Sequence, residues 1–500
     1  MKKLFLVLTI CCLSLTVTAQ TAFGEKPKLV VGIVVDQMRW DYLDRYYNQF
    51  TDGGFRRMID QGYSCNNCLI NYVPTVTAIG HTSAYTGTTP AFHGICGNNF
   101  YIDGKNVVSC QDDEVKAVGS DVDFGNRSPR NMLATTIGDQ LRLHTDFQSK
   151  VVGVSYKDRA AIFPAGHSAN AAYWLDTKNL RFITSTYYMT ELPDYVKQVN
   201  DDLKKNKEVQ QAGNRIGYTP LCGTITTDMA IAALKGEQLG RGKATDMLCV
   251  SYSETDIIGH EWGTRGEHTD AAYLTLDKDL ARLFQTLDEE VGKGQWVAFL
   301  TADHGAAHNW RFMREHRLPG GALFNRDLKK GIADDLKKAL GTQGKVVGDI
   351  MDYRIFLNYD EMESDEETEE VKDGIVSYVK TLPEYATAVR FDQVRTTSLP
   401  GRLAEQILKG YYPGRAGDII MIPKPHYYSS WEGAPQGQTT HGEWNPYDAH
   451  IPCLFVGWKI PHGATSREVH ITDIAPTVCQ LLHIQQPSAC IGEAITEITK

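Results

Sequence analysis

The chain has no surplus of basic residues and, after its first twenty residues, no long hydrophobic run. Its 500 residues include 51 Lys and Arg against 61 Asp and Glu, which gives a formal net charge of -10 at pH 7. No basic stripe offsets that charge, which argues against a general nucleic-acid-binding protein. No later apolar stretch approaches the length of a membrane-spanning helix. No internal repeat or low-complexity segment stands out either. Length and composition agree with a large enzyme that has a main unit and substantial insertions or a second lobe.

The one long apolar run is at the N-terminus, and it predicts a signal peptide over residues 1–19. Lys2 and Lys3 precede LFLVLTICCLSLTVTA, and the segment ends in the small residues that a signal peptidase needs. A membrane anchor is the alternative, but the run is short and no basic stop-transfer segment follows. We therefore expect the mature chain, residues 20–500, to be exported to the periplasm without a membrane span.

A second Cys-x-x-Cys motif is missing, which limits what the first one can do. Cys65 and Cys68 have the spacing of a local disulfide or of half a zinc ribbon. The lack of a second pair counts against the ribbon and leaves the disulfide open. Cys249 and Cys479 lie inside apolar runs, so we expect both to be buried.

Four short apolar runs each end on residues that bind metals or phosphates. The runs are LVVGIVVD, which ends at Asp36; VVGVSYKDR, which delivers Lys157 and Arg159; MLCVSYSETDIIGH, which delivers Asp256 and His260; and VAFLTADHG, which delivers Asp303 and His304. Each run is rich in β-branched residues and is followed by helix-like sequence, as in a parallel α/β sheet. Such sheets bind ligands outside the carboxyl ends of their strands. The four endings therefore predict one shared site.

The rest of the chain predicts helices around this sheet and a smaller lobe. Helical patterns occur in DYLDRYYNQF, GGFRRMIDQG, PTVTAIGHTSAYTG, TTDMAIAALKGEQLG and residues 267–291. The long interval between His304 and His441 contains the strand-like YRIFLN, the helical EEVKDGIVSYVKTL and the strand-like YATAVRF. This pattern predicts an α/β lobe inserted at about residues 325–437. The acidic run from Asp360 to Glu370 is predicted to be a solvated helix face.

Carboxylates and imidazoles in these motifs predict a metal centre. Asp256 and His260 form D-x-x-x-H, and the wider set adds Asp36, Asp303, His304 and, in TTHGEWN, His441. Several imidazoles favour zinc or another transition metal over magnesium or calcium. Six ligands are too many for one open catalytic zinc but suit a pair, as in displacement at phosphorus. Five other histidines are expected to serve hydrogen bonding or capping: His81, His93, His167, His308 and His450.

The motifs together resemble those of the alkaline phosphatase superfamily. The matching segments are DQMRWDYL, PTVTAIGHTSAYTG, HGICGN, YKDRAAIFPAGH, SETDIIGH, TADHG, THGEWNPYDAHIPCLFVG and TDIAPTVCQLL. They are most similar to the PafA-like phosphatases, which are related to the type I phosphodiesterase/nucleotide pyrophosphatase branch. The resemblance runs from about residue 29 to 485. It implies a doubly wound, mostly parallel sheet with helices on both faces and two zinc ions at its carboxyl edge.

The resemblance also assigns roles to individual residues. One zinc would be held by Asp256, His260 and His441, and the other by Asp36, Asp303, His304 and the nucleophile Thr77. Asn98, Lys157 and Arg159 would contact the phosphoryl group, and the last two are associated with a preference for monoesters. Thr75, the other threonine of PTVT, is expected to cap the helix.

These assignments predict a zinc-dependent phosphate monoester hydrolase that acts through a phosphothreonine. Its substrates would be small phosphorylated metabolites of broad type. A diesterase or nucleotide pyrophosphatase of the same superfamily is the main alternative, because both kinds of enzyme use a threonine. A non-catalytic zinc- or phosphate-binding relative is a third possibility. No C/S-x-P-x-R motif occurs around Thr77, which counts against a sulfatase.

Overall fold

The computed structural model describes residues 25–342 and 345–499. The predicted signal peptide, residues 1–19, lies outside these ranges. Within the described part of the chain, no helix is both long enough and apolar enough to cross a membrane.

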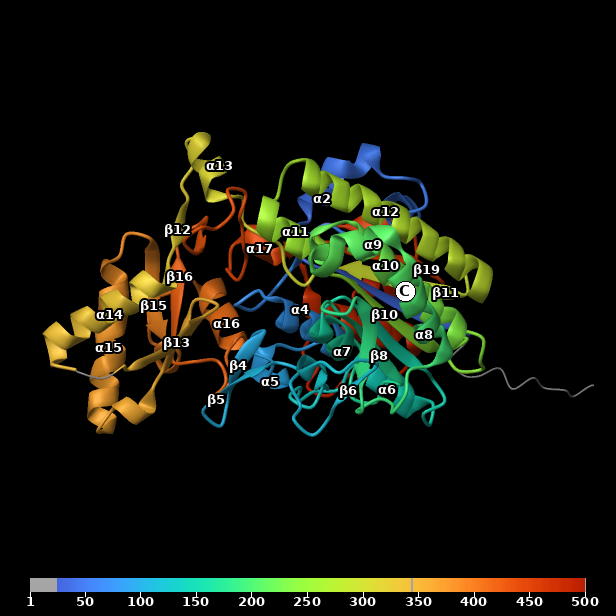
Figure 1. Cartoon of the computed structure of the whole chain (residues 1–500). Coiled ribbons are helices and arrows are strands. Elements are labelled where there is room, and N and C mark those ends of the chain that lie inside the picture. Colours follow the sequence, from blue (N-terminus) through green and yellow to red (C-terminus); the bar gives the residue numbers. More distant parts are fainter. Residues whose placement is uncertain (1–24, 343–344, 500) are drawn as a thin grey trace, which may run out of the picture.

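A ten-stranded sheet forms the centre of the molecule (Figure 1). Its strands are β1 (Leu29–Val35), β2 (Tyr63–Cys65), β6 (Ala117–Val118), β7 (Val151–Ser155), β8 (Ala171–Asp176), β9 (Arg181–Ser185), β10 (Asp246–Tyr252), β11 (Trp296–Thr301), β19 (Cys453–Gly457) and β20 (Gly463–Thr465). Their order is β20-β2-β19-β11-β1-β10-β7-β8-β9-β6. The block β11-β1-β10-β7-β8 is parallel, whereas β19 and β9 run antiparallel to it on either side. The predicted α/β sheet is therefore confirmed, with mixed edges.

The four apolar runs that predict strands become β1, β7, β10 and β11, and every residue in them is buried. Strands covered on both faces have no polar face, which explains their continuous apolar sequence. Gly32 of β1 is required by a close approach, because a Cβ there would lie 2.2 Å from the Tyr85 hydroxyl. The helix that carries Tyr85 can therefore pack directly on the centre of the sheet.

Helices cover both faces of the main sheet (Figure 1). On one face α4 (Thr77–Thr86) packs against α7 (Asp158–Ala165) and α18 (Ile474–Leu482). On the other, α10 (Leu221–Gly236) packs against α8 (Asp194–Lys205) and α12 (Glu267–Leu287), and α11 (Glu254–Trp262) contacts α12. The remaining helices of this part include α2 (Asp41–Tyr46), α3 (Phe55–Gln61) and α6 (Ile137–His144). All five predicted helical segments contain a helix.

A separate four-stranded antiparallel sheet lies beside the main unit, at the left of Figure 1. Its strands, in spatial order, are β13 (Val347–Met351), β14 (Arg354–Leu357), β16 (Ile419–Pro423) and β15 (Tyr385–Arg390). Helices α14 (Asn325–Leu340) and α15 (Asp365–Thr381) share an apolar core with it, and α16 (Gly401–Lys409) belongs to a second small cluster. The predicted strand-helix-strand pattern falls in this region. The lobe limits of about 325 and 437 stay a prediction.

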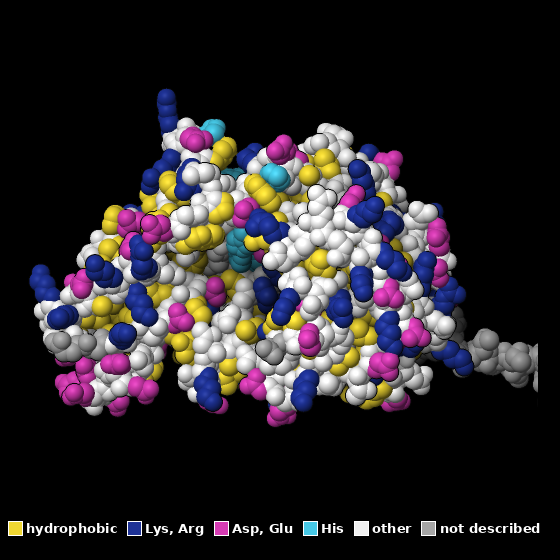
Figure 2. All heavy atoms as spheres, in the orientation of Figure 1, with side chains coloured by type: hydrophobic (Ala, Val, Ile, Leu, Met, Phe, Trp, Pro, Cys, Tyr) yellow, Lys and Arg dark blue, Asp and Glu magenta, His cyan; other side chains and the backbone are white. Residues whose placement is uncertain are grey.

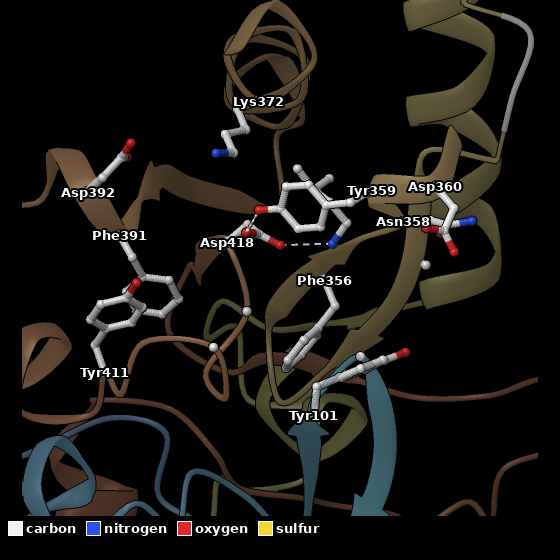
Figure 3. A pocket seen from close by; sticks show the side chains of 15 residues that line it. Tyr101, Phe356, Asn358, Tyr359, Asp360, Lys372, Phe391, Asp392, Tyr411 and Asp418 are labelled. Atoms are coloured by element: carbon white, nitrogen blue, oxygen red, sulfur yellow. Dashed lines mark hydrogen bonds between the residues drawn. The ribbon is translucent and has the colours of Figure 1, made fainter. Parts of the chain in front are cut away.

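A pocket of about 670 Å³ lies between this lobe and the hairpin of β4 (Asn99–Ile102) and β5 (Lys105–Val108) (Figure 3). Two stacked ring pairs contribute to its wall, Tyr101 with Phe356 and Phe391 with Tyr411. None of the predicted site residues lines it.

Candidate metal centre and nucleophile

The carboxyl ends of four parallel strands bring the predicted ligands together. Asp36 directly follows β1, Asp303 follows β11, and Lys157 follows β7. Asp256 lies in α11, which begins two residues after β10. All four side chains are buried. Figure 2 shows histidine side chains in the hollow between the lobe and the main unit.

Asp256, His260 and His441 form the first cluster of possible ligands. Their ligand atoms all lie within 4.8 Å of one another. Nε2 of His260 is 3.1 Å from Asp256 Oδ1, and Nε2 of His441 is 3.7 Å from the same oxygen. Asp256 and His260 are four residues apart on α11, so they share one face of that helix. His441 reaches this face from a loop almost two hundred residues later in the chain.

A second cluster surrounds His304. Its Nε2 lies 3.5 Å from Asp36 Oδ1 and 3.5 Å from Asp303 Oδ2. The tightest group of ligand atoms here is Asp36, Asp256 and His304, again within 4.8 Å of one another. Asp256 thus lies between the two predicted ligand sets, and its carboxylate faces both of them.

The ligand types fit a transition metal, and so do the hydrogen bonds that the histidines form. Each histidine directs Nδ1 to a backbone carbonyl: His260 to Thr439 at 2.9 Å, His441 to Thr75 at 2.6 Å and His304 to Gly305 at 2.9 Å. Such bonds fix the tautomer and leave the Nε2 lone pair for a metal. Among the described residues, three buried ligand atoms have no hydrogen-bond partner: Asp36 Oδ1, Asp303 Oδ2 and His304 Nε2. Buried polar atoms of this kind are costly unless a ligand pairs with them.

Lys157 joins the two clusters electrostatically. Its Nζ lies 2.6 Å from Asp36 Oδ2 and 2.6 Å from Asp256 Oδ2. Burial, with the charges of Asp256 and Asp303, raises the pKa of Asp36 well above its usual value. Burial alone would also raise the pKa of Asp256, but His260 and Lys157 outweigh it and hold that pKa well below its usual range. The site therefore concentrates negative charge that only cations can balance.

Thr77 is the first residue of α4, and Val76 precedes it in an extended conformation without a side-chain cap. The prediction that Thr75 caps this helix is wrong. Its hydroxyl instead donates to the carbonyl of Glu443 at 2.9 Å, because the loop after His441 lies against this segment. Thr77 Oγ1 lies 3.5 Å from Lys157 Nζ. A hydroxyl at a helix N-terminus lies where the backbone N–H groups favour negative charge.

Asn98 and Arg159 complete the group around the start of α4. Asn98 Oδ1 accepts hydrogen bonds from the backbone N–H of Ala78 and from Nε of Arg159, both at 3.0 Å. These bonds use the oxygen of Asn98, which leaves its amide nitrogen as a donor. All ten predicted site residues thus lie in one region of the fold.

His81, which the sequence pattern assigns only to hydrogen bonding or capping, forms hydrogen bonds and also touches this site. Its Nδ1 lies 2.9 Å from the Thr77 carbonyl and 3.2 Å from Asp303 Oδ2, and its Nε2 lies 2.7 Å from Ser251 Oγ. The spacing of four residues from Thr77 on one helix is the signal that could have identified it. Three other histidines form hydrogen bonds outside the two clusters: His93, His308 and His450.

None of the cysteines in residues 25–499 belongs to the two ligand clusters. Cys65 and Cys68 are both buried free thiols in the structure, which does not support the local disulfide. Cys249 and Cys479 are buried, as predicted.

Known proteins resemble this chain over nearly its full length. Residues 30–448 match the family Type I phosphodiesterase / nucleotide pyrophosphatase. A protein of Myroides odoratus named calcium-transporting ATPase is 41% identical over 99% of each chain. Alkaline phosphatase PafA of Elizabethkingia meningoseptica is 42% identical, over 95% of this chain and 94% of the relative. The crystal structure of wild-type PafA matches at 40% identity with a TM-score of 0.91, covering 95% of this chain and 99% of PafA. The predicted resemblance to PafA-like phosphatases is confirmed.

Proposed function

Because the chain belongs to the type I phosphodiesterase/nucleotide pyrophosphatase family, we propose that it is a zinc-dependent phosphate monoester hydrolase with a phosphothreonine intermediate. The observation that carries this proposal is that Thr77 and six side chains able to bind metal lie at one edge of the sheet. The chain's strong similarity to an alkaline phosphatase supports the reaction class.

We assign one zinc ion to Asp256, His260 and His441, and a second to Asp36, Asp303, His304 and Thr77. When bound, two zinc ions would favour the alkoxide form of the nucleophile and stabilise charge on the leaving oxygen. The histidines are already oriented for this role by their Nδ1 hydrogen bonds, so the protein does not need to reorder them on metal binding.

The Thr77 hydroxyl would give up its proton as Oγ1 bonds to phosphorus, while the bond to the leaving oxygen breaks and that oxygen takes up a proton to depart as an alcohol. Water would then attack phosphorus, break its bond to Oγ1, return a proton to Thr77 and release inorganic phosphate. Most of the work in phosphoryl transfer is positioning and charge stabilisation. The start of α4 holds the nucleophile rigidly, and the bond from Ala78 N–H to Asn98 fixes that asparagine beside it.

The cations favour monoesters over the diester alternative. Lys157 lies 3.5 Å from Thr77, and Arg159 hydrogen-bonds to Asn98, which in turn bonds to the start of α4. A monoester dianion carries more charge for these two cations than a diester monoanion. Charge-assisted hydrogen bonds contribute roughly 1.5–3 kcal/mol each. A non-catalytic binding role is disfavoured because the nucleophile and every predicted ligand are retained.

We further propose that the substrates are small phosphorylated metabolites and that the enzyme acts in the periplasm. The predicted signal peptide supports export. With an overall charge of -10, the protein must attract anionic substrates through its local cations and metals rather than through its general surface.

The test of this function is a direct comparison of two substrates. An aryl phosphate monoester should be hydrolysed with a higher kcat/KM than the methyl diester of the same aryl group. A preference for the diester would replace the monoesterase assignment with the phosphodiesterase one. No hydrolysis of either would leave a binding role.

A further inference from the structure

Gln37 has a backbone conformation that glutamine rarely adopts. It follows Asp36 at the end of β1, its φ is 63°, and it is 3% exposed. This left-handed region is unfavourable for residues with a Cβ atom. Strain of this kind persists where the surrounding structure imposes it, and it is concentrated at functional sites. The contacts of Gln37 identify what imposes it.

The side chain of Gln37 holds the first ligand cluster. Its Nε2 donates to Asp256 Oδ1 at 2.6 Å. This is the same oxygen that faces Nε2 of His260 and His441. The amide therefore fixes the carboxylate atom around which the two histidines converge.

The backbone of Gln37 holds the second cluster. Its N–H donates to Asp303 Oδ1 at 3.1 Å, and the N–H of His304 donates to the same oxygen at 3.0 Å. Both donors occupy Oδ1, so Oδ2 of Asp303 is the oxygen directed at His304 Nε2. One residue thus orients a carboxylate in each of the two ligand sets.

The neighbouring helix is shaped to accept this side chain. Gly259 lies between Asp256 and His260 on α11, and a Cβ at that position would be 1.9 Å from Gln37 Oε1. Any side chain there would displace the amide from Asp256. Both the glycine inside a helix and the left-handed glutamine are locally unfavourable, and together they permit this one contact.

We propose that Gln37 is a positioning residue that orients Asp256 and Asp303 relative to each other and thereby sets the zinc affinity of the site. The inference rests on the paired zinc centres proposed above. Partners that orient metal ligands typically change metal affinity 10–100-fold when they are removed.

Two substitutions separate this role from a purely structural one. Gln37→Gly removes the amide, keeps the backbone N–H and relieves the left-handed strain. Gln37→Met keeps the Cβ atom and the chain length but cannot donate. Chelator competition on the zinc-loaded enzyme should reveal about 10–100-fold weaker binding of one zinc ion in both variants. In excess chelator, both variants should still unfold cooperatively, so that the loss of zinc affinity is measured on folded protein.

Gln238 offers a matched control, because it is also a glutamine with positive φ, at 54°, but is exposed and hydrogen-bonds to no ligand. Gln238→Gly should leave zinc affinity unchanged. Wild-type zinc affinity in both Gln37 variants would overturn the inference. A Gln37→Gly protein that no longer unfolds cooperatively in excess chelator would assign Gln37 to folding instead. A wild-type enzyme that binds no zinc would overturn the proposed function itself, and the inference with it.

Discussion

His441 donates a hydrogen bond from Nδ1 to the backbone carbonyl of Thr75, at 2.6 Å, across 366 residues of sequence. Two residues after Thr75 is the proposed nucleophile, and Nε2 of the same imidazole faces Asp256. A single ring therefore connects the segment that begins α4 with the first ligand cluster. The nucleophile and the metal ligands are positioned by one continuous set of contacts, and each can be tested separately.

Removal of metal should abolish activity reversibly. Purified enzyme is expected to contain about two zinc ions per chain, since paired-metal catalysis needs both. Dialysis against a chelator should abolish monoester hydrolysis, and added zinc should restore it. Elemental analysis together with rate measurements checks this prediction. Full activity in metal-free enzyme would contradict it.

Thr77→Ala should reduce kcat/KM for a monoester by at least about 10³-fold, as expected for loss of a nucleophile. Thr75→Val is the matched control: it loses the bond to the Glu443 carbonyl, which contributes about 1 kcal/mol to stability, but keeps the carbonyl that holds His441. Acid quenching should trap phosphate on the peptide that contains Thr77. Label on Thr75 would reject the assignment.

Lys157→Ala and Arg159→Ala should each lower kcat/KM for monoesters about tenfold or more, because each removes a charge-assisted contact. The loss on diesters should be smaller, since an ester substituent replaces one charged oxygen. Parallel kinetics on both substrates measure the difference. Equal losses would mean that the pair serves folding or general binding.

His81→Ala should weaken zinc binding and lower kcat, because the imidazole contacts both Asp303 and the Thr77 carbonyl. A decrease of about 10–100-fold in zinc affinity is typical when such a partner is lost. His93→Ala is the control. This buried histidine hydrogen-bonds to Ser83, which lies on the helix that carries His81, but it belongs to neither ligand cluster. If both variants bind zinc equally, His81 has only a packing role.

Asp448 should contribute stability to the metal-free protein that falls as pH rises between about 4 and 8. Burial raises the pKa of the Asp448 carboxyl from 3.8 to about 8 in the folded state. This carboxyl therefore holds its proton in the folded chain but loses it in the unfolded chain within this interval, and its stabilising contribution is lost as pH rises through the folded pKa. Urea denaturation in excess chelator should give a shallower pH dependence for Asp448→Asn. An unchanged slope would show that Asp448 does not titrate in this way.

The strands, and the clustering of the proposed ligands at one sheet edge, could be predicted from sequence, because both depend on local patterns. Buried parallel strands need unbroken apolar runs, and the residues that follow them meet at one edge whatever the details of packing. Asp36, Asp256 and Asp303 were identifiable for this reason. Strands β14 and β15 and helix α15 were recognisable from their own local patterns, whereas the limits of an inserted lobe stay a prediction.

The partners of these ligands could not be predicted, because they depend on contacts between distant segments. The capping role expected for Thr75 fails since residues 441 and 443, more than 360 positions away, occupy its carbonyl and its hydroxyl. Gln37 has an ordinary sequence context, and only its φ and its bonds to Asp256 and Asp303 distinguish it. His81 is likewise distinguished only by its contact with Asp303, which is distant in sequence.

The insertion of the lobe between His304 and His441 has a consequence for biosynthesis. A ribosome makes the chain from its N-terminus, so Asp36, Asp303 and His304 emerge before the lobe, whereas His441 emerges after it. Until then, the first cluster has only Asp256 and His260, fewer than the three protein ligands that catalytic zinc sites use. A chain that ends before residue 441 would thus have one complete and one incomplete set of the proposed ligands, and we expect it to bind only one zinc ion.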